Sequence, residues 1–346
     1  MDRRDFLKTT GAAAVTAGTA AGTPATAGDV DGIAKPAAPA ILSGVQDLTL
    51  ASTSPTDLPG SGAERLARRL EAATDGRFRI EVRRGSGDAD LGFGSAHHSA
   101  HPAFAIFAGL PFGQGLDAAA MQTWLGAGGG QMLWDELAAA HHFKPLVAGH
   151  TGESAGVWAT ARLERALDLA GLRIAVSGLA GEVLSTFGAT PVELGPHEIK
   201  AALADGRIAA AEWLGPLAAV APDLQPLTQR LYQPGFHPTG TLLALGIRRQ
   251  LWEHLSAADQ AIFEACAAEA YHLSLTDAHA HALIARQVEL PEKWPVRLAF
   301  PAEMAAALDA ATRDAVARLA EFDATAQRIH DSYQAFRTML GEPRMA

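Results

Sequence analysis

The chain has 346 residues, of which 48% are hydrophobic and 19% are charged, and its formal net charge is −10. This length predicts roughly two domains with a sizeable core. Cys266 is the one cysteine, so an intramolecular disulfide and a cysteine-ligated zinc site are both excluded. The acidic balance disfavours a nucleic-acid partner, because no excess of basic side chains is available to neutralise phosphates.

The first residues resemble a bacterial export signal. The pair Arg3-Arg4 precedes a weakly apolar run that ends at Ala25-Thr26-Ala27, the small-residue pattern of a cleavage site. We interpret residues 1–27 as a twin-arginine signal peptide and the Gly-, Ala- and Pro-rich residues 28–45 as a linker. The alternative is a disordered tail that happens to contain Arg-Arg. No other segment has the roughly 18 apolar residues of a membrane helix, so we expect a soluble periplasmic protein.

The part of the chain that follows the linker predicts a β-α-β unit, in which a helix covers a sheet. Hydrophobic residues alternate in the two expected strands and recur with helical spacing between them. The next segments are a Gly- and Ser-rich stretch, an apolar loop and a helical region that glycines interrupt. The expected elements are strands at 46–52 and 77–82, a helix at 61–74, a buried loop at 102–113 and helices within 117–142.

Strands alternate with short helices in the middle of the chain, which predicts a mostly parallel sheet. Ligands of such sheets bind beyond the carboxyl ends of the strands. Glu212 and Trp213 lie at such an end and are candidate ligand-binding residues. The expected elements are strands at 171–176, 191–194 and 207–213 and helices at 179–189 and 197–206.

The last third of the chain is predicted to be helical. Residues 251–286 favour one long helix, and from Leu308 to Leu340 apolar residues recur with alternating spacings of four and three. Two interpretations of this seam stay open. The helix lies on its own domain, or the seam joins two copies of the chain as a homodimer.

Six segments together resemble the extracytoplasmic solute-binding subunit of tripartite ATP-independent periplasmic (TRAP) transporters, in the branch that binds 2-oxo acids and lactate, often with a metal ion. They occur in family order. The matching segments are PAFAIFAGLPFG at 102–113, GGGQMLWDEL at 128–137, HTGESAGVW at 150–158, GLRIAVSGLAGEVLSTFGATPVEL at 171–194, AALADGRIAAAEWLGP at 201–216 and YQPGFHPTGT at 232–241.

The resemblance implies an α/β, periplasmic-binding-protein-like (type II) fold with two lobes, mixed sheets, a long bracing helix and a long C-terminal helix. It assigns residues 46–150 and about 237–265 to lobe 1, residues 151–236 and about 266–300 to lobe 2 with crossing segments, and residues 301–346 to the C-terminal helix. It also implies a binding protein and not an enzyme. A small organic acid, such as a 2-oxo or hydroxy acid, or a related polar solute would bind between the lobes, and the partners would be TRAP membrane subunits.

The resemblance also carries site residues. Glu212 and Trp213 match the family pair that holds the ligand or a sodium or calcium ion. Glu153, Ser154 and Trp158 would line one wall of the site, and Phe236 and His237 the opposite rim. Ala175 takes the place of the family's carboxylate-binding arginine. Arg173, which shares a strand face with Ala175, is either a reserve anion partner or a surface residue.

Three further positions differ from the family pattern. Ser154 replaces a glutamine, and Pro238 replaces an acid. The helix that ordinarily connects the second strand of lobe 1 to the next strand is missing between Arg84 and Asp90. Its loss would uncover one face of the sheet, unless a partner or a rearrangement covers it.

Two alternatives to an organic-acid-binding protein stay open. His97, His98 and His101, with His150, Glu153 and Glu212, could bind a transition metal in a metal-binding protein or a metal-dependent enzyme, because imidazole and carboxylate suit zinc or copper. Otherwise these histidines are solvent-exposed loop residues. The other alternative is a diverged interaction protein without a ligand.

Overall fold

The computed structural model describes residues 44–54, 62–96, 101–214, 224–287 and 296–341. The chain divides into two units, residues 1–38 and 39–346, and every described residue belongs to the second unit. The predicted signal peptide and most of the predicted linker therefore lie outside the described residues. Within the described ranges, no helix combines the length and the apolar character that crossing a membrane requires.

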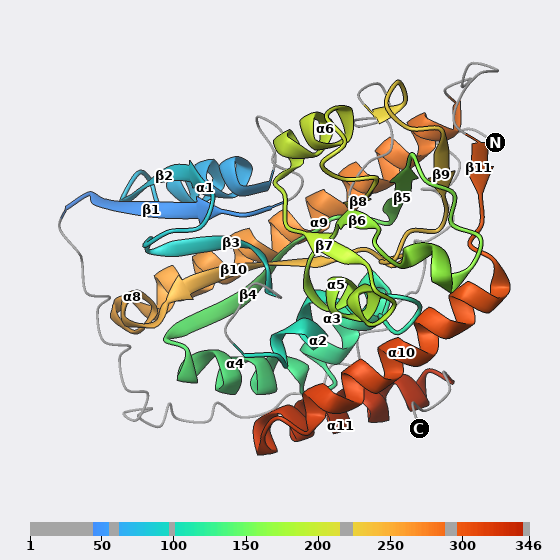
Figure 1. Cartoon of the computed structure of the whole chain (residues 1–346). Coiled ribbons are helices and arrows are strands. Elements are labelled where there is room, and N and C mark those ends of the chain that lie inside the picture. The colour runs from blue at the N-terminus through green and yellow to red at the C-terminus, as the bar shows by residue number, and fades with distance from the viewer. Residues whose placement is uncertain (1–43, 55–61, 97–100, 215–223, 288–295, 342–346) are drawn as a thin grey trace, which may run out of the picture. The chain divides into compact units, whose positions relative to one another are not determined.

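The first of the two sheets combines strands from residues 46–150 with one strand from residues 242–248 (Figure 1). Its strands, in spatial order, are β2 (Phe78–Arg84), β1 (Gln46–Ser52), β3 (Leu91–Ser95), β10 (Leu242–Arg248) and β4 (Phe143–His150). The strands β2 and β3 run parallel to β1, and β10 runs antiparallel to both of its neighbours. Its strands come from the segments assigned to lobe 1, and the lobe boundaries themselves stay a prediction.

The second sheet is also mixed. Its strands, in spatial order, are β11 (Val296–Leu298), β9 (Arg230–Tyr232), β5 (Ser154–Ala159), β8 (Ala210–Leu214), β6 (Arg173–Ala175) and β7 (Thr190–Val192). The strands β8, β6 and β7 are parallel, as the alternating pattern predicted, and β5 pairs with β8 in the antiparallel sense.

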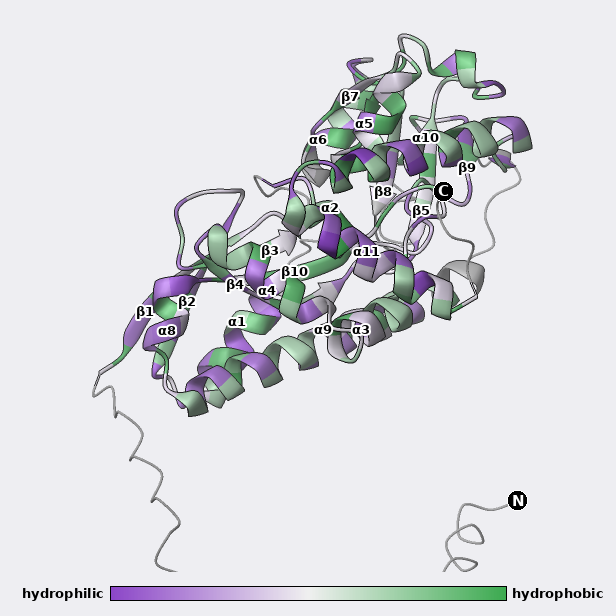
Figure 2. Cartoon of the chain, turned by 90° about the horizontal axis from the view of Figure 1, so that it is seen from below, coloured by the Kyte–Doolittle hydropathy of each residue, from purple (hydrophilic) through white to green (hydrophobic). Residues whose placement is uncertain are grey.

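Helices cover both faces of the second sheet, and in the first sheet they cover one face and the β10–β4 part of the other, because these surfaces carry hydrophobic side chains. In the first sheet, α1 and α9 cover one face, while β10, hydrophobic along most of its length in Figure 2, also contacts α2. In the second sheet, α5 packs against β7, with α10 packed on α5, and residues of α6 form a core cluster with the other face. The helices are α1 (Gly62–Ala73), α2 (Phe104–Ala108), α3 (Ala118–Gly126), α4 (Gly130–Ala140), α5 (Gly178–Thr186), α6 (Pro196–Ala204), α8 (Arg249–His254), α9 (Ala257–Gln287), α10 (Ala302–Ala320) and α11 (Ala324–Met339), with a 3-10 helix, η3 (Ala166–Leu169).

Most of the expected elements are confirmed, including the glycine break between α3 and α4. The single helix expected over residues 251–286 is interrupted, since α8 ends at His254 and the long helix α9 begins at Ala257. Two other expectations were wrong. The segment expected to be a buried loop contains the short helix α2. The C-terminal segment forms two helices instead of one long helix, because Asp323 caps a new helix by accepting a hydrogen bond from the amide of Ala326 at 2.7 Å.

Most residues of the apolar seam from Leu308 to Leu340 pack against other helices of the same chain. Leu308, Leu319, Ile329 and Tyr333 are buried, and α10 packs on α5 while α11 packs on α4. Phe322, between the two helices, is 61% exposed. The first interpretation of the seam, a helix that lies on its own domain, therefore accounts for the buried positions.

The connection between β2 and β3 is unusually short, as the missing family helix predicted. Parallel strands ordinarily need a crossover of a dozen or more residues, whereas residues 85–90 suffice here. The reason is that β3 pairs only with the end of β1, from Leu50 opposite Leu91 to Ser52 opposite Phe93. The pairing with β3 does not extend to Thr49 of β1. The side chain of Asp90 bonds Thr49 instead, since its Oδ2 accepts hydrogen bonds from the amide and the hydroxyl of Thr49, both at 2.9 Å.

The sheet face left without this helix is polar. Asp47 of β1 and Arg79, Glu81 and Arg83 of β2 are exposed, and they alternate with buried residues on the opposite face. Alternation of this kind is typical of a sheet with one solvated face, so no additional partner is needed to cover it.

Two segments cross between the sheets and hold each other. The Thr151 amide donates to the Thr241 carbonyl, and the Thr241 amide donates to the Thr151 hydroxyl, both at 2.9 Å. Gly240 has a φ of +79°, and a Cβ atom there would lie 1.9 Å from the carbonyl oxygen of Gly152. This approach, possible only for glycine, fixes the crossing segments beside the candidate site.

We expect Asp90→Ala to lower the free energy of unfolding by about 2 kcal/mol, because it leaves the half-buried Thr49 amide without its partner. Urea denaturation measures the effect. Asp88→Ala is the matched control, since the Asp88 side chain is 94% exposed and pairs with Arg248 at the surface. Equal losses of stability in the two variants would contradict the role of Asp90 in the sheet.

His150, the last residue of β4, predicts a pH dependence of stability. Burial lowers the pKa of His150 from 6.5 to about 4, and its Nδ1 accepts a hydrogen bond from the Gly152 amide at 3.0 Å. The unfolded chain takes up a proton below about pH 6.5 while the folded chain stays neutral. The stability that this histidine contributes is therefore complete above pH 6.5 and decreases by about 3 kcal/mol as the pH falls to about 4.

The variant His150→Asn keeps an acceptor for the Gly152 amide but does not titrate. Denaturation of both proteins at several values between pH 7 and pH 4 isolates the effect, because all other groups cancel in the difference. We expect wild type to lose stability relative to the variant as the pH falls. Parallel curves would show that the His150 pKa is not depressed.

Candidate functional site

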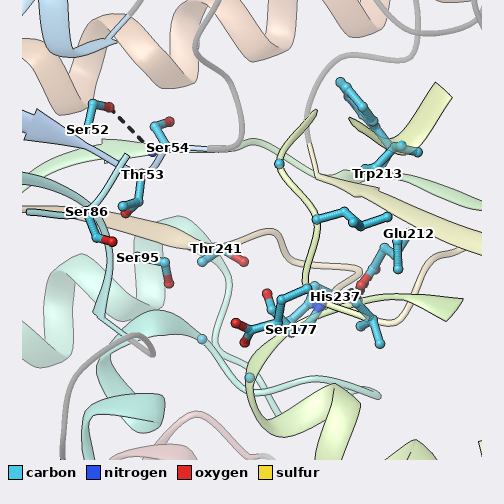
Figure 3. A pocket seen from close by; sticks show the side chains of 18 of the residues that line it. Ser52, Thr53, Ser54, Ser86, Ser95, Ser177, Glu212, Trp213, His237 and Thr241 are labelled. Atoms are coloured by element: carbon cyan, nitrogen blue, oxygen red, sulfur yellow. Dashed lines mark hydrogen bonds and ion pairs between the residues drawn. The ribbon is translucent and has the colours of Figure 1, made fainter. Parts of the chain in front are cut away.

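A cavity of about 610 Å³ lies where the carboxyl ends of the parallel strands of both sheets meet. This is the position at which open α/β sheets bind ligands, and the volume falls within the range of small-molecule sites. Figure 3 shows side chains of the first sheet on one side and Glu212, Trp213 and His237 on the other. The lining residues at or next to the strand ends are Ser52 of β1, Arg84 of β2, Ser95 of β3, Ala175 of β6, Glu193 after β7, and Glu212 and Trp213 of β8.

A buried carboxylate lies at the base of the second side. The Oε1 atom of Glu212 accepts hydrogen bonds from the His237 amide at 2.8 Å and from the Ser154 hydroxyl at 3.1 Å. Its Oε2 atom lies 2.8 Å from Nδ1 of His237. An ionised carboxylate only accepts hydrogen bonds, so Nδ1 carries the hydrogen of this contact. These contacts fix the orientation of His237, which also lines the cavity.

The pKa of Glu212 lies below its usual value. Burial acts to raise this pKa, but the charge of His237 and the hydrogen bonds from His237 and Ser154 outweigh burial. Glu212 is therefore ionised at neutral pH, although only 2% of its side chain is exposed.

The oxygen atoms around Glu212 fit a sodium or calcium ion in chemical type. The Ser154 hydroxyl lies 3.1 Å from Oε1 of Glu212 and 3.3 Å from the carbonyl oxygen of Trp213, so three hard oxygen donors are together. A Cβ atom at Gly235 would come within 2.2 Å of the Ser154 hydroxyl and 2.7 Å of Glu212. Glycine at this position leaves space for the donor set.

The structure brings some predicted site residues together. Glu212 is hydrogen-bonded to both Ser154 and His237, and Trp213 lines the same cavity. Glu153 is adjacent to Ser154 in sequence, but it is exposed and does not line the cavity.

Two other predicted site residues are positioned differently from what the resemblance implied, and a third, Arg173, takes one of its two expected positions. Trp158 is 0% exposed and packs in the core between the second sheet and α6, because it lies on the sheet face that α6 covers. Phe236 packs between Phe112 and Phe300, with ring centroids at 5.0 and 5.5 Å. Arg173, at the start of β6, is exposed and does not line the cavity, which agrees with its surface interpretation.

The histidine metal site is not formed by the described histidines. His101 uses both ring nitrogens elsewhere: Nδ1 accepts from the Ala103 amide, and Nε2 lies 3.0 Å from Asp323. His97 and His98 lie outside the described residues. Across the described part of the chain, no group of three or more His, Cys, Asp or Glu residues is placed to hold a metal ion.

Sequence reasoning missed the side of the cavity formed by the first sheet. Ser52, Thr53 and Ser54 follow one strand, and Arg84 ends the next. A signal was present, because Ser52 ends a strand that the sequence predicts within a β-α-β unit. The rule that located Glu212 at the end of its strand also applies to Ser52.

One curated relative is similar to this chain in sequence. The chain is 32% identical over 225 residues to the monocarboxylate 2-oxoacid-binding periplasmic protein of Nostoc sp.. The aligned region covers 60% of this chain and 61% of the relative, so the chain matches less than two thirds of that protein's length.

Solved structures of TRAP transporter solute-binding proteins are similar in fold. A protein from Bordetella bronchiseptica, crystallised as a dimer with calcium and picolinate, gives a TM-score of 0.78 at 24% identity, covering 86% of this chain and 93% of that one. A protein from Pseudoalteromonas atlantica with bound sodium and pyruvate gives 0.77 at 23% identity, covering 86% and 95%. At these identities the likeness shows the fold alone, and it confirms the predicted two-lobed α/β architecture.

A family match covers most of the chain, from residue 86 to residue 321. The matched family is described as bacterial extracellular solute-binding protein, family 7. Since this match spans more than half of the sequence, the chain belongs to that family, which confirms its predicted resemblance to the solute-binding subunits of TRAP transporters.

Proposed function

We propose that this protein is the periplasmic receptor of a TRAP-type uptake system and that it binds a small organic acid in the cavity between the two sheets. The observation that carries the proposal is the convergence of the strand ends of both sheets on one cavity, with the buried Glu212 and His237 at its base and the half-buried Ser154 bonded to Glu212. The family consists of solute-binding proteins of transport systems and not of enzymes. The cavity would bind its ligand without covalent chemistry.

A monocarboxylate is the ligand class that the relatives support. The Nostoc protein is named for monocarboxylate 2-oxo acids, and the Pseudoalteromonas protein was solved with pyruvate. In this chain Glu212 and Trp213 would contact the ligand or its cation, and His237 would position Glu212. Ser154 supports both, because its hydroxyl lies within hydrogen-bonding distance of the Glu212 carboxylate and the Trp213 carbonyl.

The cation in this proposal is sodium or calcium, held by the Glu212 carboxylate and the Trp213 carbonyl with Ser154 beside them. When bound, it would balance the charge of Glu212 and attract an anionic ligand oxygen. The ions found in the neighbouring structures support this choice. The TRAP membrane subunits are the proposed partners, and a homodimer through the C-terminal helices stays a prediction.

Calorimetric titration with pyruvate, lactate, longer 2-oxo acids and gluconate tests the function. We expect saturable binding of at least one acid and at least tenfold weaker binding of that acid by Glu212→Gln, since the exchange removes a charge and places an amide donor against His237. Repeating the titration with EDTA and with added calcium or sodium tests the cation.

Glu182→Gln is the matched control, because Glu182 is an exposed residue of α5 outside the cavity. It should leave affinity unchanged. If no acid of the panel binds to the wild-type protein, or if Glu212→Gln binds as well as wild type does, the proposed site is wrong.

The proposed export route is the twin-arginine pathway, on the strength of Arg3-Arg4 and the cleavage pattern at residues 25–27. We expect the double substitution Arg3→Lys, Arg4→Lys to leave the precursor in the cytoplasm, whereas Lys8→Gln should still reach the periplasm. Cell fractionation and the mass of the exported chain measure the outcome. Equal export of the two variants would exclude the twin-arginine route.

A further inference from the structure

The side chain of Thr241 is buried in the wall of the cavity, and its hydroxyl group is unpaired. Thr241 is 2% exposed and lines the cavity. Its Oγ1 atom makes no hydrogen bond within the described residues. A buried hydroxyl without a partner costs free energy, because it gives up its hydrogen bonds to water and gains none in return. Such groups are rare in folded proteins, and one in the wall of a cavity is explained when a ligand supplies the partner.

The other hydroxyl groups of the cavity do not share this property. Some interact within the chain, and the rest are exposed, where water satisfies them. Those with an interaction are Ser52, Ser54, Ser95 and Ser177. The exposed ones are Thr53 and Ser86. Among the described residues that line the cavity, Thr241 is therefore the one with a buried polar side-chain atom that has no partner.

The backbone of Thr241 is held in place on its crossing segment. Its amide and its carbonyl both bond to Thr151 of the other crossing segment. The turn before it is closed by the Gly240 amide, which donates to the His237 carbonyl at 2.9 Å. This turn connects Thr241 to the histidine that positions Glu212. Figure 3 shows Thr241 in the cavity, with His237 across from it.

Glycine at position 109 leaves space beside Thr241. Gly109 follows α2, has a φ of +113° and lines the cavity. A Cβ atom there would lie 3.9 Å from the Cα atom of Thr241 and 3.1 Å from the carbonyl oxygen of Gly240. Since no hydrogen bond holds the side chain of Thr241, rotation about χ1 can turn its hydroxyl toward a ligand in this space.

We infer that the Thr241 hydroxyl donates a hydrogen bond to an oxygen atom of the bound ligand, which makes Thr241 a ligand-binding residue on a crossing segment. The inference rests on the proposed function and adds this residue to its site. A carboxylate or keto oxygen only accepts hydrogen bonds, so the hydroxyl is the donor. Because this position is shielded from bulk water, solvent competes little with the bond. The contact joins the ligand to the segments that cross between the sheets.

The variant Thr241→Val tests the inference, because valine has nearly the shape of threonine but no hydroxyl. Calorimetric titration compares both proteins with pyruvate, lactate, longer 2-oxo acids and gluconate. We expect the acid that wild type binds most tightly to bind about 10- to 100-fold more weakly to the variant. The midpoint of thermal unfolding of the free protein should rise by about 1 to 3 °C, since the variant no longer buries an unpaired group. Thr241→Ser keeps the hydroxyl and should recover most of the affinity.

Thr239→Val is the matched control. The hydroxyl oxygen of Thr239, two residues earlier, is also buried without a partner, but Thr239 does not line the cavity. This variant should raise the midpoint of thermal unfolding in the same way and leave the affinity for each acid unchanged. A gain of stability in both variants, with a loss of affinity in Thr241→Val alone, distinguishes a ligand contact from a structural role.

Unchanged acid affinity in Thr241→Val would overturn the inference and leave the proposed function standing. An equal loss of affinity in Thr239→Val would overturn it as well, because the effect would then come from the segment and not from the hydroxyl in the cavity. A lower unfolding midpoint of Thr241→Val would also overturn it, since the hydroxyl would then be paired in the free protein. Failure of every acid to bind to the wild-type protein would instead contradict the proposed function, and the role of Thr241 with it.

Discussion

The burial of one carboxylate is the constraint on which the arrangement of the site depends. An ionised group removed from water is costly unless donors surround it. Glu212 obtains these donors from Ser154 of the neighbouring strand and from the amide and ring of His237, which follows β9. The carboxylate therefore ties two strands of the second sheet to a segment that leads into the first. Any residue larger than glycine at position 235 would interfere with this arrangement.

The two sheets contribute different chemistry to one cavity. The side formed by the second sheet is preorganised, because Glu212 and His237 are buried and fix one another. The side formed by the first sheet is polar, and most of its lining residues carry hydroxyl groups, some buried and some exposed. One side therefore holds fixed groups, and the other holds hydrogen-bonding groups that can adjust to a ligand. This combination suits a binding protein whose ligand contacts both sheets.

The sequence predicted the elements well where hydrophobic periodicity was regular. The strand at 46–52, the helix break at the glycines after Trp124 and the alternation from 171 to 213 all follow from local patterns. It predicted the site only in part. Glu212 and His237 were found through strand ends and the family resemblance, but Trp158 and Phe236 pack in the core. Which face of a strand a helix covers depends on tertiary packing, and local spacing does not encode it. The break at Asp323 was missed because the apolar spacing continues across the cap.

The pair of C-terminal helices, α10 and α11, constrains how the cavity can open. The helix α10 packs on α5 at the second sheet, whereas α11 packs on α4 and α2 beside the first, and the two helices pack on each other. A change in the separation of the sheets therefore has to be accommodated by sliding along the α10–α11 contact or by releasing one of its outer contacts. The α10–α11 pair would therefore resist separation of the two sheets, while the crossing segments bend.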